Sequence, residues 1–256
     1  MRILSKYIAF LLAALLAGPY ARAQAVKVAA AADLKFAMTE LAAQFEKQSG
    51  AKLDVTYGSS GNFLSQIQNG APFDLFFSAD SEYPKKLEAA GLTEPGILRE
   101  YAVGHIVIWT PTDSEINAAK DGWKSLLHPR VKKIAIANPE HAPYGRAAVA
   151  AIKKAGIYEQ VKDKLVYGEN ISQAAEFVQS RNAQAGIVAL SLALSPAMKN
   201  GNRWEIPADS YPAIKQAAVI LKASKNKDGA RSFLDFVSGP QGREILQRFG
   251  FTVPAP

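Results

Sequence analysis

Short apolar runs alternate with stretches whose apolar residues recur every three or four positions, from Val26 almost to the end of the chain. The run VKVAAA at 26–31 is typical of a buried strand, and the residues after Asp33 keep helical spacing until Ser49-Gly50. The next expected elements are strands at 53–58 and 74–80, a helix at 61–69, and a helix that ends at Gly91. This alternation predicts an α/β fold with largely parallel sheets.

A second series of the same kind begins after Gly104. Its expected strands lie at 105–110, 133–138, 164–169, 185–191 and 217–223, and its expected helices lie near 123–127 and at 145–155, 171–181, 228–237 and 241–249. No Gly/Ser-rich tether separates the two series, so we expect two α/β lobes joined by strands rather than by a flexible chain. A cleft between two lobes is the natural place for a ligand.

The first 25 residues differ from the rest. Arg2 and Lys6 precede an apolar run at 7–19, and Ala21-Arg22-Ala23 has the small-x-small pattern that a signal peptidase cleaves. Because the run is shorter than the ~20 residues that span a bilayer, we expect a secretory signal peptide over residues 1–23, with cleavage after Ala25 as the alternative. Removal of residues 1–23 leaves 27 basic and 23 acidic residues, so the formal charge falls from +7 to +4. The mature chain is expected to be exported and soluble.

Composition excludes several kinds of chemistry. The 256 residues include no cysteine, which rules out disulfides, thiolate metal sites and cysteine nucleophiles. The three histidines are far apart and lack metal-ligand spacing, and no run of Lys and Arg is dense enough for nucleic-acid binding. No G-x-S-x-G motif marks a hydrolase nucleophile. An exported hydrolase is therefore disfavoured.

Four helices are expected to begin where strands end, each at small or hydrogen-bonding residues. The starts are Ala32-Asp33, Ser59-Ser60-Gly61, Pro143-Tyr144-Gly145 and Asn170-Ile171-Ser172. The first turn of a helix carries unpaired N–H groups and about half a positive charge, so several starts aimed at one cleft would bind an anion without basic side chains. Each start taken alone is explained equally well by helix capping. Together they suggest a site for a tetrahedral oxyanion.

Four strings give the chain a family resemblance. AAADLKFAM at 30–38, GSSGNFLSQIQNGAPFDLFFSAD at 58–80, ANPEHAPYGRAA at 137–148 and GPQGREILQRFGF at 239–251 resemble the periplasmic molybdate-binding proteins of ABC importers. The resemblance runs in one register from Val26 to about Val253. It implies a two-lobed type II periplasmic binding protein fold, with lobe I formed by residues 26–101 plus 218–256 and lobe II by residues 102–217. It also implies that molybdate or tungstate is held between the lobes by hydroxyls and backbone N–H groups.

Carried over residue by residue, the resemblance implies an oxyanion site made of Ala32, Asp33, Ser59, Ser60, Tyr144 and Ile171. Ser60 matches the family's hydroxyl donor, with Ser59 beside it. Tyr144 and Ile171 match positions that contact the oxyanion through backbone N–H groups. No catalytic residue, no cofactor and no metal ion held as a bare cation is implied.

The chain departs from the family pattern at two positions. Asp33 stands where many members have serine or asparagine, and a carboxylate repels a unit negative charge 4 Å away by about 1 kcal/mol even in water. We expect Asp33 to cap its helix and leave a backbone N–H for the ligand; alternatively, it accepts a hydrogen bond from a protonated oxyanion such as hydrogen phosphate. Ala189 stands where some members have a ligand-contacting tyrosine, and the hydroxyl of Tyr144 could replace it from across the cleft.

The expected function is capture of molybdate, and also of tungstate, in the periplasm by a monomer that delivers it to an ABC permease of the inner membrane. Three alternatives stay open. The same fold could bind sulfate, phosphate or chromate, the chain could be an exported hydrolase, or it could report a ligand to a membrane receptor.

Overall fold

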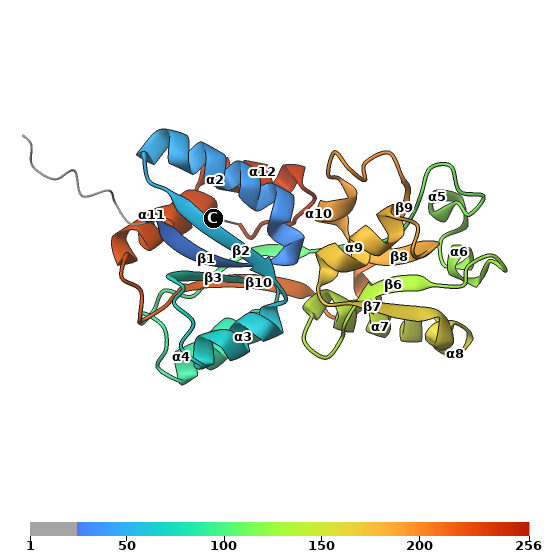
Figure 1. The fold of residues 1–256 in the computed structure, drawn as a ribbon, viewed down its shortest axis with the longest axis horizontal. Helices are drawn as coiled ribbons and strands as arrows, with labels where there is room; N and C mark the ends of the chain where they lie inside the picture. Colours follow the sequence, from blue (N-terminus) through green and yellow to red (C-terminus); the bar gives the residue numbers. More distant parts are fainter. Residues whose placement is uncertain (1–24, 256) are drawn as a thin grey trace, which may run out of the picture.

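A computed structural model describes residues 25–255 and shows two mixed sheets, each covered by helices, lying end to end along the long axis of the molecule (Figure 1). The two-lobed α/β architecture predicted from the sequence is confirmed. The expected signal peptide at 1–23 lies outside the described residues. Within the described part of the chain, no helix combines the length and apolarity that a membrane crossing requires.

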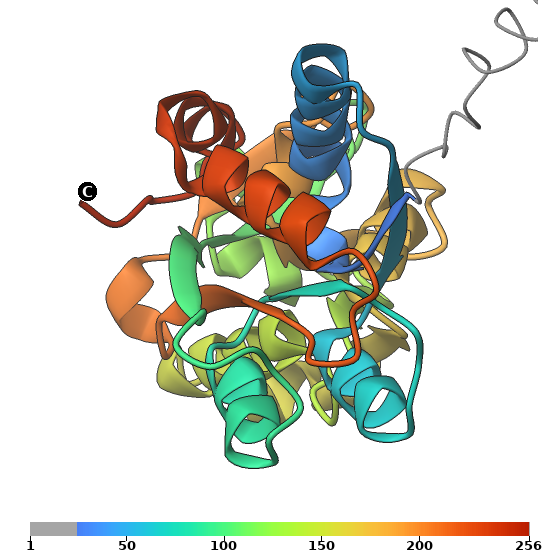
Figure 2. The same ribbon diagram turned by 90° about the vertical axis from the view of Figure 1, so that its left-hand side faces the viewer.

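The first sheet has the strand order β2-β1-β3-β10-β4. Its strands are β1 (Val26–Ala31), β2 (Leu53–Gly58), β3 (Leu75–Ser78), β4 (Arg99–Gly104) and β10 (Ile214–Ile220). β1 is parallel to both β2 and β3, whereas β10 is antiparallel to β3 and β4. The helices of this lobe are η1 (Ala32–Leu34), α2 (Lys35–Ser49), α3 (Ser60–Gln68), α4 (Glu82–Ala89), α11 (Lys227–Ser238) and α12 (Pro240–Arg248). Figure 2 shows α2, α11 and α12 on one face of the sheet and α3 and α4 on the other.

The second sheet has the strand order β7-β6-β8-β5-β9. Its strands are β5 (Ile106–Thr110), β6 (Ile134–Ala137), β7 (Leu165–Gly168), β8 (Ala185–Ala189) and β9 (Asn202–Glu205). The helices of this lobe are α5 (Ala118–Asp121), α6 (Lys124–Leu127), α7 (Pro143–Lys154), α8 (Tyr158–Val161), η2 (Lys162–Lys164), α9 (Ile171–Gln179), α10 (Leu190–Ala193) and η3 (Ala208–Ser210). β6 is parallel to β7 and β8, and β5 is antiparallel to β8 and β9.

Both sheets are less parallel than the sequence pattern predicts. β10 runs against its neighbours because it brings the chain back from the second sheet into the first. Two strands, β4 and β9, were not expected, since REYAVG and NRWE mix charged and apolar residues within a few positions. β10 begins at Ile214, three residues before the predicted start at Ala217.

The chain passes between the sheets twice, from Gly104 to Ile106 and again between Glu205 and Ile214. We propose these two crossings as the hinge between the lobes. The expected boundaries, after residues 101 and 217, fall inside β4 and β10, and both strands belong throughout to the first sheet.

An aromatic cluster fixes the C-terminal helices to the first lobe. Phe233 of α11 is fully buried, and its ring centroid lies 5.0 Å from that of Phe45 in α2 and 5.9 Å from that of Phe77 in β3. Phe77 in turn packs against Tyr101 of β4, with ring centroids 5.2 Å apart. The last part of the chain therefore belongs to the core of the lobe that holds the N-terminal strand.

Truncation of this cluster tests that assignment. We expect Phe233→Ala to lower the free energy of unfolding by about 3–5 kcal/mol, because it leaves a cavity among aromatic rings that cannot close. Tyr167→Ala removes an aromatic ring that is 49% exposed and should change stability by no more than about 0.5 kcal/mol. Urea denaturation of both variants provides the measurement, and equal losses in the two would contradict the assignment.

Candidate functional site

The four predicted helix starts meet at one cavity between the lobes. All six predicted site residues line it, namely Ala32, Asp33, Ser59, Ser60, Tyr144 and Ile171. The rest of the lining consists of Ala31, Gly58, Ala79, Ala142, Pro143 and Asn170, so the lining contains no lysine or arginine. The sequence correctly predicted which segments come together.

The convergence follows from the two sheets. β1 and β2 are parallel neighbours whose register ends at Ala31 and Gly58, and η1 and α3 start just beyond them. β6 and β7 are likewise parallel neighbours in the other lobe, ending at Ala137 and Gly168 before α7 and α9. Because the carboxyl ends of parallel neighbours lie at one edge of a sheet, each lobe brings two helix N-termini to the same side of the cavity.

Ser60 is buried and positioned as a donor. It is the first residue of α3, and its Oγ accepts a hydrogen bond from the backbone N–H of Ala79 at 2.9 Å. Since a hydroxyl has one proton and two lone pairs, this contact fixes the oxygen and leaves the proton available to a ligand. The role of Ser60 as a donor to a ligand stays a prediction.

The second lobe offers backbone amides from two helix starts. Tyr144 is the second residue of α7 after Pro143, and Ile171 is the first residue of α9. Amides in the first turn of a helix have no intrahelical acceptor and lie at the positive end of the helix dipole. The side chain of Asn170 caps α9 by accepting from the N–H of Gln173 at 3.1 Å, which leaves the amide of Ile171 free of that bond.

Ser59 makes a contact across the lobes that the sequence did not reveal. Its hydroxyl lies 2.8 Å from Nδ1 of His141 and 2.8 Å from the carbonyl oxygen of His141. The N–H of Gly61 donates to the same carbonyl at 3.0 Å, and a Cβ on Gly61 would lie 2.6 Å from that oxygen. The two lobes are therefore in contact at this edge, and Gly61 permits the approach.

Asp33 does not cap a helix, which corrects the expectation. It lies inside η1, and neither η1 nor α2 has a side-chain cap. Its Oδ2 instead accepts from the Tyr144 hydroxyl at 3.0 Å and from Nε2 of Gln216 at 2.6 Å. Gln216 is held in turn by the hydroxyl of Tyr101, which donates to its Oε1 at 2.7 Å. Asp33 does not cap the helix because its buried carboxylate accepts hydrogen bonds from Gln216 of β10 and from Tyr144 of the opposite lobe instead.

Burial sets the proton affinity of this carboxyl. Asp33 is 1% exposed, and burial raises its pKa from 3.8 to about 6, although the hydrogen bonds from Gln216 and Tyr144 act to lower it. Burial also raises the pKa of Tyr144 and Tyr101 well above the ordinary value, with the negative charge of Asp33 as the next cause. Both tyrosines therefore stay protonated and act as donors in this network.

Tyr144 does not supply its hydroxyl to the cavity as a replacement for a tyrosine at position 189. The hydroxyl donates to Asp33 instead, and it also accepts a hydrogen bond from Nε2 of Gln216 at 3.1 Å. Ala189 is buried at the end of β8. A side chain at Gly104 would overlap the Tyr144 hydroxyl, so the network also requires a glycine beside the first crossing between the lobes.

More bonds tie the second lobe to the η1 backbone. Ser191 Oγ donates to the carbonyl of Asp33 at 2.7 Å, and Ser172 Oγ donates to the carbonyl of Ala32 at 2.9 Å. These serines were not predicted as site residues, because isolated serines after a strand or in a helix start carry no distinguishing pattern. They hold the peptide groups of the first helix start in place at the cavity.

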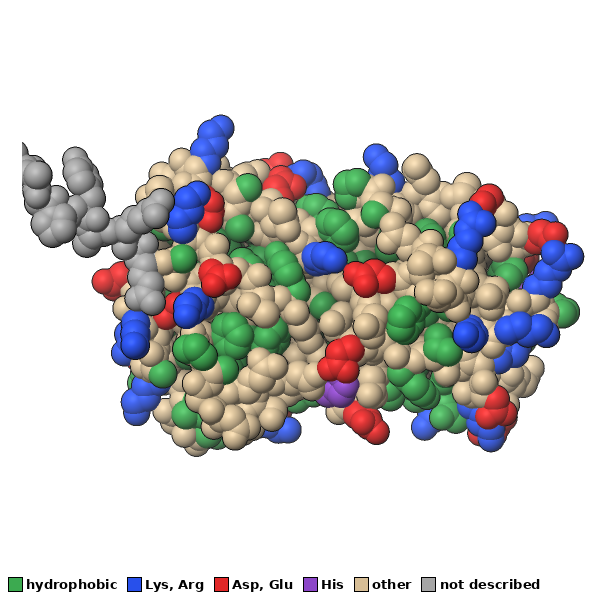
Figure 3. All heavy atoms as spheres, in the orientation of Figure 1, with side chains coloured by type: hydrophobic (Ala, Val, Ile, Leu, Met, Phe, Trp, Pro, Cys, Tyr) green, Lys and Arg blue, Asp and Glu red, His purple; other side chains and the backbone are tan. Residues whose placement is uncertain are grey.

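An ion pair and a hydrogen bond cross the rim of the interface. Lys35 lies 3.5 Å from Glu176, and Asn62 donates to Glu169. On the face shown in Figure 3, side chains of both charges and a histidine lie along the line where the lobes meet. These contacts and the buried network hold the two lobes against each other in this structure.

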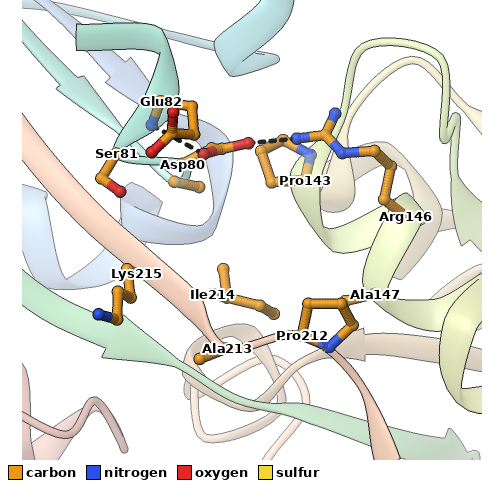
Figure 4. Close-up of a pocket in the computed structure, with 11 residues that line it drawn as sticks. Asp80, Ser81, Glu82, Pro143, Arg146, Ala147, Pro212, Ala213, Ile214 and Lys215 are labelled. Carbon is orange, nitrogen blue, oxygen red and sulfur yellow. Dashed lines mark hydrogen bonds and ion pairs between the residues drawn. The ribbon is translucent and has the colours of Figure 1, made fainter. Parts of the chain in front are cut away.

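A second hollow of about 360 Å³ lies between the lobes beside the first cavity, and the two share Ala79 and Pro143. Figure 4 shows Arg146 of α7 reaching across it to Asp80, where an oxygen lies 2.5 Å from its guanidinium. Arg146 also donates to the Tyr83 hydroxyl at 2.9 Å. Arg146 therefore bridges the two lobes, and the carboxylate of Asp80 compensates its charge.

Comparison with known proteins agrees with this geometry. The family model described as bacterial extracellular solute-binding protein matches residues 26–252. The molybdate-binding protein ModA of Azotobacter vinelandii is 41% identical over 232 residues, covering 90% of this chain and 91% of the relative, and ModA of Rhodobacter capsulatus is 38% identical, covering 90% and 89%. The solved periplasmic molybdate-binding protein of A. vinelandii superposes with a TM-score of 0.84 at 34% identity, covering 90% of this chain and all of the other. The chain therefore belongs to the bacterial extracellular solute-binding protein family.

Proposed function

We propose that this chain captures molybdate, and also tungstate, in the cavity between its lobes and delivers it to an ABC permease of the inner membrane. The observation that carries the proposal is the convergence of four helix starts and the Ser60 hydroxyl on one cavity whose lining contains no lysine or arginine. Such a cavity suits an oxyanion bound by neutral donors. The molybdate-binding relatives support the choice of ligand.

The proposed contacts come from both lobes. Lobe I contributes the Ser60 hydroxyl and a backbone N–H at Ala32 or Asp33, and lobe II contributes the amides of Tyr144 and Ile171. Ser59 lines the cavity but its hydroxyl is bonded to His141, so we assign it to the closing contact as well as to the site. No covalent step follows from this set, and the activity is capture.

Capture requires closure of the lobes. In an open form the donors of one lobe engage only part of the oxyanion, whereas the closed form offers all of them at once. The ligand therefore shifts the population toward the closed form by the difference in its affinity for the two. The permease would then recognise the closed form, whose rim is set by Lys35–Glu176 and Arg146–Asp80.

Discrimination between oxyanions depends on size. Sulfate and molybdate share charge and shape, and neutral donors cannot separate them by charge. The longer Mo–O bonds allow molybdate to reach every donor of a cavity whose radius is fixed by contacts such as Gly61 to His141. The N-terminal sequence and the relatives' periplasmic naming support export to the periplasm, where we propose that the protein acts as a monomer.

Titration calorimetry of purified, ligand-free protein tests the assignment directly. We expect strong binding of molybdate and of tungstate and much weaker binding of sulfate and phosphate, measured separately and in competition. Absence of heat with molybdate and tungstate would refute the proposed ligand. A preference for phosphate would indicate the alternative in which Asp33 accepts a hydrogen bond from a protonated oxyanion.

Ser60→Ala removes the proposed hydroxyl donor. A hydrogen bond to a charged group contributes about 1.5–3 kcal/mol, so the Kd for molybdate should rise by about tenfold to about a hundredfold. Ser65→Ala changes an exposed serine of the same helix and should leave the Kd unchanged. If both variants bind like the unmodified protein, Ser60 is not a ligand contact.

Gly61→Ala tests closure. The added methyl group would lie 2.6 Å from the His141 carbonyl oxygen, so the lobes cannot close fully and the Kd for molybdate should rise at least about tenfold. The ligand-free open form should be as stable as before or more stable, since alanine favours a helix over glycine by about 0.5–1 kcal/mol. Small-angle X-ray scattering should show a smaller compaction on adding molybdate than in the control Gln66→Ala. Unchanged compaction and affinity would exclude this closing contact.

A further inference from the structure

A carboxylate lies inside a cavity that we propose holds a dianion. Asp33 lines the cavity together with Ser60, Tyr144 and Ile171, and it is almost fully buried. No cationic side chain lines the cavity to compensate for it. Two negative groups with no cation between them in a water-excluding site repel each other strongly. The arrangement therefore needs an explanation beyond the binding of an anion by neutral donors.

The two oxygens of Asp33 have different surroundings. Oδ2 accepts two hydrogen bonds, from Tyr144 and Gln216. Oδ1 is buried and has no hydrogen-bond partner among the described residues. A buried carboxylate oxygen without a donor is costly. A proton on Oδ1 removes this cost, and it leaves both bonds to Oδ2 intact.

We propose that Asp33 carries a proton on Oδ1 in the ligand-bound closed state and donates it to an oxygen of the bound dianion, so that capture of each molybdate takes up one proton from solvent. This inference rests on the proposed function. The proton adds one more donor to the neutral set and removes the only negative charge from the cavity lining. It also answers how a residue with a formal charge of −1 is compatible with the site.

The pKa of Asp33 is shifted in the direction that proton uptake requires. Burial already raises its pKa to about 6 in the closed form without ligand, and a dianion placed beside it raises the pKa further. Because the pKa is higher in the bound state than in the free state, binding is favoured at low pH. Affinity falls as pH rises from the lower pKa toward the higher one.

The groups that face Asp33 do not titrate in this interval. Tyr144 of α7 and Tyr101 of β4 have pKa values raised well above the ordinary value, first by burial. Gln216 of β10 and Ser191 of α10 are neutral. His141 is an ionisable side chain at the cavity rim, where its Nδ1 lies 2.8 Å from the Ser59 hydroxyl and its Nε2 lies 3.8 Å from Glu169. It is therefore the group to control for.

Calorimetry with molybdate between about pH 6.5 and about pH 8.5 measures the coupling. We expect the Kd to rise by up to about tenfold per pH unit, because one proton is linked to binding. Repeating the titration near neutral pH in buffers with different protonation enthalpies gives the number of protons, which should be close to one per molybdate.

Three variants separate Asp33 from other causes. Asp33→Asn keeps the shape and offers a permanent N–H donor, so the pH dependence and the proton uptake should disappear and binding near pH 8.5 should become tighter. Tyr144→Phe removes a hydrogen bond across the closed lobes that favours the ionised carboxylate, so the pKa of the bound state should rise and the fall in affinity should extend to higher pH. His141→Gln should keep the pH dependence of the unmodified protein, whatever its absolute affinity.

The outcomes distinguish the inference from the proposed function. No molybdate binding at any pH overturns the proposed function and, with it, the inference. Molybdate binding without proton uptake, or with the same pH dependence in Asp33→Asn, overturns the inference and leaves the function standing. A pH dependence lost in His141→Gln and kept in Asp33→Asn also overturns it.

Discussion

The proposed function requires the removal of a doubly charged anion from water without a cation opposite it. Desolvation of an ion costs several kcal/mol, and in this cavity only hydrogen-bond donors can offset it, because the lining holds no lysine or arginine. Neutral donors act at short range and in fixed directions, so each must lie within hydrogen-bond reach of an anion oxygen. One rigid lobe cannot surround a tetrahedron and still admit it. Two lobes that close can do so, and this is why the donors are divided between them.

The same arrangement of strands and helices supplies these donors in both lobes. Each lobe contains a pair of parallel neighbours, β1 with β2 and β6 with β7, and each of these strands is followed by a helix that starts at the cavity. Both lobes thus present the same structure to the ligand, a pair of helix N-termini. β10 runs antiparallel to β3 and brings Gln216 within hydrogen-bond distance of Asp33. The strand that follows one crossing between the lobes contributes Gln216 to the buried polar network, so closure and site geometry are coupled.

Much of this arrangement could be predicted from the sequence, and the failures share one cause. Strand-to-helix junctions are local features, so the segments at Ala32, Ser60, Tyr144 and Ile171 were identified from spacing and helix-start residues before any coordinates. The partner of Asp33 is not local. Gln216 is 183 positions away, and helix capping was the best local explanation for an aspartate after a strand. His141 was missed for the same reason, since its bond to Ser59 spans 82 positions and exists only when the lobes meet. Periodicity predicts elements, whereas contacts across a closing interface leave no periodic signal.

The position of Asp33 also affects the balance between the open and closed forms of the ligand-free protein. Closure buries this carboxyl even without a ligand, and an ionised group buried among neutral partners makes the closed form less favourable at neutral pH than it would be with an amide. In an open form the same carboxyl would be hydrated and would carry no such cost. An ionised Asp33 therefore favours the open, accessible form of the empty protein, while a bound oxyanion and its proton favour the closed one. Asp33 would then make closure of the lobes depend on whether a ligand is bound. A permease that recognised only the closed form would require this dependence.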